Sequence, residues 1–247
     1  MINYIKADMW RMERRLPRVI AIILMNIVMA GAIIYSSNQD SWNSVLYMDR
    51  LMFGVQIAGV ACGILEFIAV FSEDFKAKTM QIAIGSGMQR RHVIVVKFVD
   101  FVLALIGDYL FLTLMGIVLA FVTQVHPNGE QMLDYGIKVL GYLLSQVGFY
   151  SLSLIFVFSL QSSLLPLITY VVLSCGLFHT LLNYLFKLKA VQPLNLDRFT
   201  LTYNSDMFIS RLMVGSFKFS AFIAIAIYIA AGYFFSTLVF KNKELEF

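Results

Sequence analysis

The sequence predicts an all-α, polytopic membrane protein with six transmembrane helices. Of its 247 residues, 60% are hydrophobic and only 14% are charged, so the mean hydropathy is high. The apolar residues also gather into long blocks, and a helix needs about 20 such residues to cross ~30 Å of hydrocarbon. A soluble all-helical protein would need polar faces on most of its helices, which these blocks lack. We therefore expect a single membrane-embedded domain over residues 1–247.

Six apolar blocks qualify, or nearly qualify, as spans. Several of them are rich in Gly, Ser and aromatic residues, as packed transmembrane helices tend to be. The two cysteines, Cys62 and Cys175, fall inside predicted spans and are interpreted as small packing residues, not as a disulfide or metal pair. The predicted spans cover residues 19–35, 51–71, 101–122, 139–160, 164–186 and 219–240.

Residues 1–18 precede the first span and have a helical pattern of their own. Apolar residues recur at spacings of three and four, which places them on one face of a helix. Trp10 and several cations lie elsewhere on this helix, a pattern typical of a helix lying in the membrane surface against anionic lipid. Pro17 is expected to mark the bend into the first span. The apolar face comprises Ile2, Ile5, Met9, Met12 and Leu16.

The distribution of basic residues predicts the orientation. If both termini are cytoplasmic, the inner segments hold 12 of the 19 Lys and Arg residues and the outer segments hold the other seven. The positive-inside rule therefore favours an N-in, C-in arrangement in the cell membrane. The net charge of +4 suits a membrane surface and calls for no nucleic-acid partner.

The connection at residues 72–92 combines six charged residues with two glycines between two apolar blocks. Ser72 is predicted to cap a short helix that begins with acidic residues, and Gly85 is predicted to end it. Ser86 and Gln89 have the spacing of a capping box for the next helix. A loop that only joined two spans would not need such signals, so this segment is expected to fold as helix, turn and helix. One face of the short helix would comprise Phe75, Thr79, Ile82 and Ala83.

This connection resembles the cytoplasmic loop between spans two and three of ATP-binding-cassette (ABC) permeases of the type-2 exporter class. The resemblance rests on EDFKAKTMQ at residues 73–81, on GMQRR at residues 87–91 and on Lys97. Chain length, six spans and a basic interfacial N-terminal helix are also similar, particularly to small permeases of bacterial peptide and lantibiotic export or immunity systems. In that family the loop supplies a coupling helix that fits a groove on a separate ATPase subunit. The resemblance implies that Glu73, Phe75, Thr79, Arg90 and Arg91 contribute to this contact, whereas a simple topology signal is the alternative for the two arginines.

What the resemblance implies is a permease that works as a dimer, with a second copy or a paralogue, together with two ATPase subunits. ATP and Mg²⁺ would be bound by those partner chains, and no cofactor is expected in this one. The expected substrate is an amphipathic peptide or a lipid-like molecule exported from the cell or the membrane. An ATP-independent channel or secondary transporter is the alternative, as is an immunity or sensor complex that removes its ligand from the membrane.

No catalytic motif is recognisable in the chain. A Walker motif needs G-x-x-x-x-G-K-[ST] between a strand and a helix, and Gly87 is followed instead by Met88 and Gln89. The three histidines are dispersed and form no H-E-x-x-H pair, and there is no G-x-S-x-G nucleophile elbow. We therefore predict a protein that is not an enzyme and holds no metal.

Three polar residues inside the predicted spans are candidates for a translocation path. Glu66 lies near the inner end of span two, Asp108 near the middle of span three, and His179 in span five. Ionisable groups in spans usually face protein or water, because exposing them to lipid is costly. Asp108 would need a partner, for which His179 or Asn183 is suggested. A structural contact between helices is the alternative role for Asp108, and a satisfied packing residue is the alternative for His179.

Two further local expectations concern polar and small residues. Asp100 can pair with Lys97 three residues earlier on the same helix. Gly59 and Gly63 have the G-x-x-x-G spacing that lets two helices approach closely.

The long outer segment Lys187–Lys218 is expected to contain a short re-entrant or surface helix.

Overall fold

The computed structural model describes residues 2–38, 42–76, 79–188, 192, 195–241 and 243, but not the side chains of Ser72, Glu73 and Lys76. Within these ranges every regular element is a helix. The first half comprises α1 (Ile2–Glu13), α2 (Leu16–Ser37), α3 (Ser44–Lys76), α4 (Thr79–Gly85) and α5 (Arg90–Val122). The second half comprises α6 (Gly129–Leu160), α7 (Leu164–Ser174), α8 (Leu177–Phe186), the 3₁₀ helix η2 (Leu196–Phe199), α9 (Leu201–Met213) and α10 (Phe219–Lys241).

Five of these helices are long and apolar enough to cross a membrane, and the number rises to six if α7 and α8 together form one span. The five are α2, α3, α5, α6 and α10. Many large apolar side chains on them are exposed, among them Val28, Leu110 and Phe121, as expected of helices that face lipid rather than water. The predicted all-helical fold is therefore confirmed for the described residues, with five to six helices that could span a membrane.

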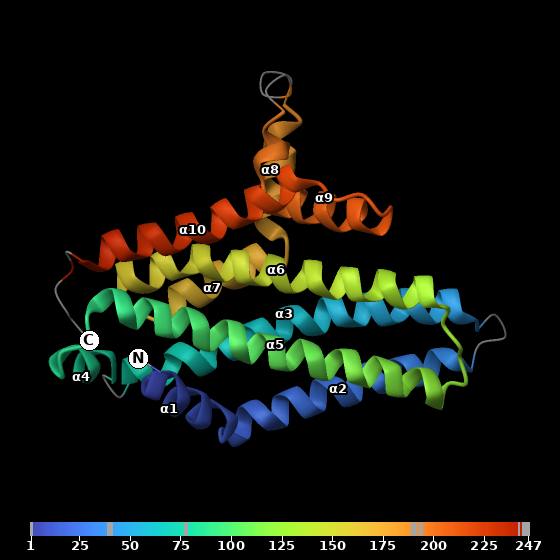
Figure 1. Ribbon diagram of the computed structural model, residues 1–247, viewed down its shortest axis with the longest axis horizontal. Helices are drawn as coiled ribbons and strands as arrows, with labels where there is room; N and C mark the ends of the chain where they lie inside the picture. Colours follow the sequence, from blue (N-terminus) through green and yellow to red (C-terminus); the bar gives the residue numbers. More distant parts are fainter. Residues whose placement is uncertain are drawn as a thin grey trace.

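The long helices form a bundle along the longest dimension of the molecule. Figure 1 shows α2, α3, α5 and α6 running along this axis, with α10 lying obliquely across α6. α1, α4 and the last turn of α10 gather at the same end of the bundle, which we call the α4 end. The first and last described helices thus meet at one end, as an even number of crossings would require.

The fifth predicted span is broken, and this corrects the expectation of one continuous helix over residues 164–186. α7 and α8 meet at a bend of 60°, and Gly176 at the break has φ +73°, a conformation that favours glycine. α7 packs against α6 and α3, whereas α8 rises away from the bundle and has no buried residue (Figure 1). The long segment after α8 contains η2 and α9, so the helix expected between residues 187 and 218 is confirmed.

The N-terminal segment forms α1, and α2 begins directly after it with Pro17 in its first turn. The expected apolar face is confirmed in part, because Met12 is buried and Met9 packs against the core, while Ile2 and Leu16 are exposed. Asp8 is also buried on this face, which was not expected. α1 packs on α5, α2 and α3. A charged residue on the buried face indicates that electrostatic pairing, in addition to apolar contact, holds this helix against the bundle.

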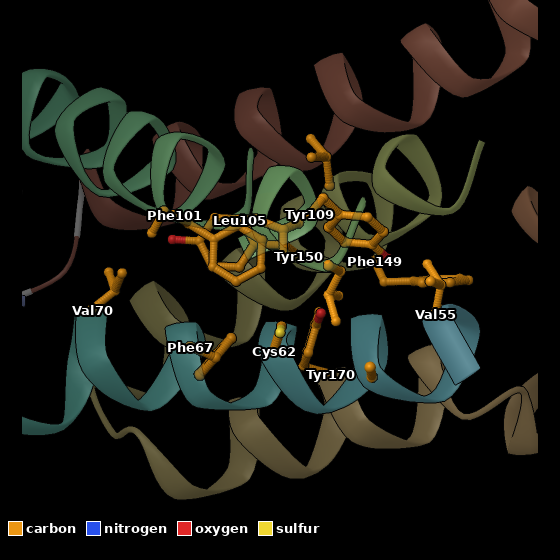
Figure 2. Packing of buried hydrophobic residues seen from close by; sticks show 14 of the residues in the cluster. Val55, Cys62, Phe67, Val70, Phe101, Leu105, Tyr109, Phe149, Tyr150 and Tyr170 are labelled. Atoms are coloured by element: carbon orange, nitrogen blue, oxygen red, sulfur yellow. The ribbon is translucent and has the colours of Figure 1, made fainter. Parts of the chain in front are cut away.

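Aromatic rings fill the interior where α3, α5, α6 and α7 meet (Figure 2). The rings of Phe101 and Tyr150 stack in parallel with their centroids 3.6 Å apart, and Phe67 stacks on Tyr170 at 5.5 Å. The Tyr150 hydroxyl donates to the carbonyl of Lys97 at 2.8 Å. Each buried phenol thus brings apolar area and a polar tip that needs a partner.

Gly59 and Gly63 lie on the face of α3 that meets these tyrosines. A Cβ atom at Gly59 would fall on the phenol of Tyr109, and one at Gly63 would fall on that of Tyr170. The G-x-x-x-G spacing therefore does permit close approach, but it admits two tyrosine side chains rather than another helix backbone. The Tyr170 hydroxyl, once seated there, donates to Gln146 at 2.5 Å.

Candidate functional site

The connection between α3 and α5 folds as a short helix flanked by turns, but its boundaries differ from those predicted. α3 continues through Ser72 to Lys76, so Ser72 does not cap a new helix. The Ser86 hydroxyl donates to the carbonyl of Ala83 at 2.8 Å, and Gln89 is the N-cap of α5 without a side-chain capping bond. The predicted capping box is therefore wrong, because Ser86 serves the end of α4 and not the start of α5.

The end of α4 is held by backbone hydrogen bonds around Gly87. The amide of Gly87 donates to Ile84 O at 3.0 Å, and the amide of Met88 donates to Ala83 O at 3.1 Å. This is the pattern of a Schellman turn, whose left-handed position is occupied by Gly87 at φ +97°. Gly85 is the last helical residue, so the stop signal lies two residues later than predicted.

The residues predicted to contact an ATPase have varied surroundings. The side chain of Glu73 lies outside the described part of the structure. Phe75 is half-buried and packs against the core, with its ring 6.3 Å from that of Phe71. The Thr79 hydroxyl donates to Asp74 at 2.7 Å. Ile82, by contrast, is 67% exposed and is the large apolar side chain that α4 presents outward.

Arg90 and Arg91 differ in their contacts. The Arg90 guanidinium donates to the carbonyl of Phe240 at 2.8 Å and to that of Lys243, and it lies over the Phe240 ring. It thus binds the C-terminal carbonyls of α10, where a cation is favourable. Arg91 is exposed and donates to Gln89 at 2.7 Å.

A buried ion-pair group, which we call the Lys97 cluster, joins α1, α3 and α5 beside α4. Lys97 is fully buried, and its ammonium lies 2.5 Å from Asp8 and also contacts Asp74. Arg11 lies 2.8 Å from Asp74 and 3.1 Å from Asp8. These contacts attach the N-terminal helix to the end of α3 and to α5. The cluster comprises Asp8, Arg11, Asp74, Lys97 and Asp100.

Asp100 belongs to this cluster without pairing as predicted. Asp100 is fully buried, and its two carboxyl oxygens make no hydrogen bond among the described residues. The predicted ion pair with Lys97 is wrong, because the Lys97 ammonium is directed to Asp8 and Asp74 instead. The cluster therefore holds three acids against two bases. A spare carboxyl in such a place is costly when ionised, since burial disfavours charge.

Asp74 connects this cluster to α4. Burial alone would raise the pKa of Asp74, but Lys97, the Thr79 hydroxyl and Arg11 outweigh burial, and the pKa lies below its ordinary value. A lowered pKa means that Asp74 stabilises the folded state above pH about 4 and that this contribution is lost as the pH falls through the folded-state pKa.

We expect the thermal midpoint of the wild type to fall in acid, below pH about 4, partly through Asp74. Asp74→Asn should have a lower midpoint at neutral pH and a smaller decrease in acid. Thermal unfolding of both proteins between neutral and acidic pH measures this, with the exposed Asp49→Asn on the same helix as the matched control. An undiminished acid decrease in Asp74→Asn would contradict the assignment.

A second buried group, the Arg18 cluster, joins α2, α3 and α5. Arg18 Nε lies 2.6 Å from Glu66 Oε1, and its Nη2 lies 3.7 Å from Asp108 Oδ1. Arg18 Nη1 also donates to the carbonyl of Met12 at 3.4 Å. Glu66 and Asp108 are thus brought together, as candidates for one site should be. The partner of Asp108 is Arg18, so the suggested pairing with His179 or Asn183 is wrong.

His179 lies apart from both clusters, on α8. Its Nε2 is 2.9 Å from the side-chain amide of Asn183, one turn later. It lines an apolar pocket of about 370 Å³ between α6, α8, η2 and α10, together with Phe149, Leu152, Phe178, Leu201 and Tyr228. Burial raises the pKa of Asp206 on α9, and His179 lies close enough to oppose part of this rise.

The residues that complete both clusters were missed as site residues by the sequence analysis. Asp8 occurs three or four residues from Ile5 and Met12, so an acid within the apolar face of α1 was a readable signal. Arg18 follows Pro17 at the start of an uncharged block of residues, which was a second signal. Neither signal identifies the distant partner, because Lys97 lies 89 residues from Asp8, and Glu66 and Asp108 lie 48 and 90 residues from Arg18.

Among the described residues, no group of three or more His, Cys, Asp or Glu side chains is arranged to hold a metal ion. No protein-family model matches the sequence, and no curated protein matches it significantly.

Proposed function

We propose that this chain is the permease subunit of an ABC exporter of the type-2 class, with both termini cytoplasmic and α4 as its coupling helix. The observation that carries the proposal is the way α4 is held. It is a short helix between the two 33-residue helices α3 and α5, and it lies at one end of the bundle, together with α1 and the last turn of α10 (Figure 1). Its Met80 and Ala83 are buried, and Ile82 is directed outward.

The attachment of α4 suits the transmission of force. Thr79 at its start is bonded to Asp74, and Asp74 is in turn paired with Arg11 of α1 and Lys97 of α5. Displacement of α4 by a partner would therefore be passed to three other helices through short, buried polar contacts. A loop that only connected two spans would gain nothing from such rigid attachment.

The contact with the ATPase subunit would centre on Ile82 rather than on Phe75. Phe75 packs against its own chain, whereas the exposed Ile82 offers apolar area that a partner groove could bury. Arg90 would support this contact indirectly, by fixing the end of α10 at the same end of the bundle as α4. The proposed assembly contains two permease chains, alike or paralogous, and two ATPase subunits that bind ATP and Mg²⁺.

The proposed substrate is an amphipathic peptide or a lipid-like molecule. Support comes from the pocket at the base of α8, whose lining is mostly aromatic and aliphatic with His179 and Thr202 as polar points. Its volume suits an acyl chain or a few apolar side chains. Removal of such a ligand from the membrane, as in an immunity complex, would use the same pocket.

The test is co-purification from native membranes in detergent, comparing wild type with Ile82→Asp. We expect the wild type to recover an ATPase with Walker motifs and Ile82→Asp to lose at least about tenfold of it, as for a buried apolar anchor. Val214→Asp is the matched control, because Val214 is 78% exposed at the end of α9, away from α4. Equal permease levels and thermal midpoints would show that the loss is specific. A stable permease that recruits no ATPase in its native membranes would favour the channel or secondary-transporter alternative.

A further inference from the structure

The Arg18 cluster contains two carboxyl groups and one cation inside the bundle. Glu66 is fully buried and Asp108 is 6% exposed. Each carboxyl has one oxygen directed to Arg18, whereas Glu66 Oε2 and Asp108 Oδ2 have no hydrogen-bond partner among the described residues. The two carboxyl groups lie within hydrogen-bonding reach of each other. Two neighbouring carboxyl groups, each with an acceptor oxygen that has no donor among the described residues, can share one proton.

Among the described residues, Arg18 is the cation that pairs with both Glu66 and Asp108, and the other groups beside them are neutral thiol, phenol and amide groups. Cys62 of α3 contributes a thiol within reach of Asp108, and the nearby phenol of Tyr170 from α7 donates to the neutral Gln146 of α6. Arg18 of α2 is the cation that contacts the pair, and Tyr109 of α5 lies beside Cys62. An unbalanced charge among such groups would be strongly unfavourable, because buried charges need a partner.

We propose that Glu66 and Asp108 form a proton-binding site, in which one shared proton leaves a single negative charge opposite Arg18. Like-charged carboxyls at close range do not both ionise readily, so they bind a proton as a pair. The site ties the start of α2, and through Met12 the end of α1, to α3 and α5. Loss of the proton places an uncompensated charge in the bundle and loosens this connection. The proposal does not depend on the proposed transport function.

Amide substitutions separate one shared proton from two ionised carboxylates. Glu66→Gln and Asp108→Asn each mimic the protonated member, donate to the remaining carboxylate and keep one anion for Arg18. The double variant Glu66→Gln/Asp108→Asn removes both anions and leaves the guanidinium buried without one. We therefore expect each single variant to keep the wild-type thermal midpoint at low pH, and the double variant to lose several degrees at every pH.

The pH dependence is the second readout, measured on the full chain in lipid nanodiscs. The wild-type midpoint should fall as the pH rises through the loss of one proton, and each single variant should lack this decrease. Infrared difference spectra should show the carbonyl stretch of a protonated carboxyl in the wild type that is absent from both single variants. Asp100→Asn separates any signal from the Lys97 cluster, and Glu130→Gln, an exposed acid on α6, is the matched control.

Three results would overturn the site. The first is a loss in each single variant as large as in the double variant at low pH, which would mean that both carboxylates are needed in ionised form. The second is a wild-type spectrum with no protonated-carboxyl signal beyond that assigned to Asp100, a measurement that stands even if the variants fail to fold. The third is a pH-dependent decrease that added Na⁺ abolishes, which would assign the site to a cation.

Discussion

Replacing Lys97 with methionine is expected to destabilise the protein by about 3–5 kcal/mol, the usual cost of removing one partner from a buried ion pair. Lys97 is fully buried, and its ammonium contacts Asp8 and Asp74. Methionine fills similar volume but leaves Arg11 as the remaining base of a cluster that holds three carboxyl groups, of which it contacts Asp8 and Asp74. For a chain of this size the loss corresponds to a decrease in the thermal midpoint on the order of 10 °C. Thermal unfolding in detergent measures it.

Two further variants make this prediction specific. Lys6→Met makes the same chemical change at an exposed position on α1 and should leave the midpoint almost unchanged. Adding Asp8→Asn to Lys97→Met removes one uncompensated acid and should recover part of the loss, so the two changes should be non-additive. Limited proteolysis should also cleave near α1 faster in Lys97→Met. Equal midpoints for Lys97→Met and Lys6→Met would show that the ion pairs do not hold α1 in place.

Replacing Gly232 with alanine is the second change with a large expected effect. Gly232 lies where α10 crosses α6, and a Cβ atom there would lie 2.5 Å from the backbone carbonyl carbon of Ser151 and 2.9 Å from its Cβ. A backbone cannot rotate out of the way as a side chain can, so the two helices must separate. We expect a loss of about 1–3 kcal/mol from overpacking, despite the gain of about 0.5–1 kcal/mol that alanine usually brings to a helix interior.

The matched control for this change is Gly107→Ala on α5. Gly107 is also helical, but a Cβ atom there would meet nothing within 4 Å. This variant should keep or slightly raise the thermal midpoint, since only the helix propensity changes. If Gly232→Ala behaves like Gly107→Ala, then α6 and α10 do not pack as closely as the structure places them.

The two clusters suggest how local chemistry could affect the whole bundle. The Lys97 cluster fixes α1 and the end of α3 to α5, and the Arg18 cluster fixes the start of α2 to α3 and α5. Together they hold the N-terminal helices by charge, in a region where apolar contact with lipid would not distinguish one packing from another. Each has one acid in excess, so both connections should respond to pH.

Much of the architecture follows from the sequence alone. Apolar blocks of the required length predicted the long helices, because hydrocarbon thickness sets a minimum that is easily recognised in a sequence. Pro17 predicted the bend between α1 and α2, since proline suits the first turn of a helix. The polarity of Glu66 and Asp108 identified them as residues that must face protein, and they do meet each other.

The tertiary structure alone decided which residues meet and where helices end. Ser72 and Ser86 have side chains suited to capping, but packing extends α3 past the first and uses the second to end α4. The break at Gly176 lies in a block whose composition suits a continuous span, so hydropathy could not reveal it. Partners such as Asp8 with Lys97, and Arg18 with Asp108, lie far apart in the sequence. Local pattern specifies that a buried charge needs a counter-charge, whereas helix packing determines which one it finds.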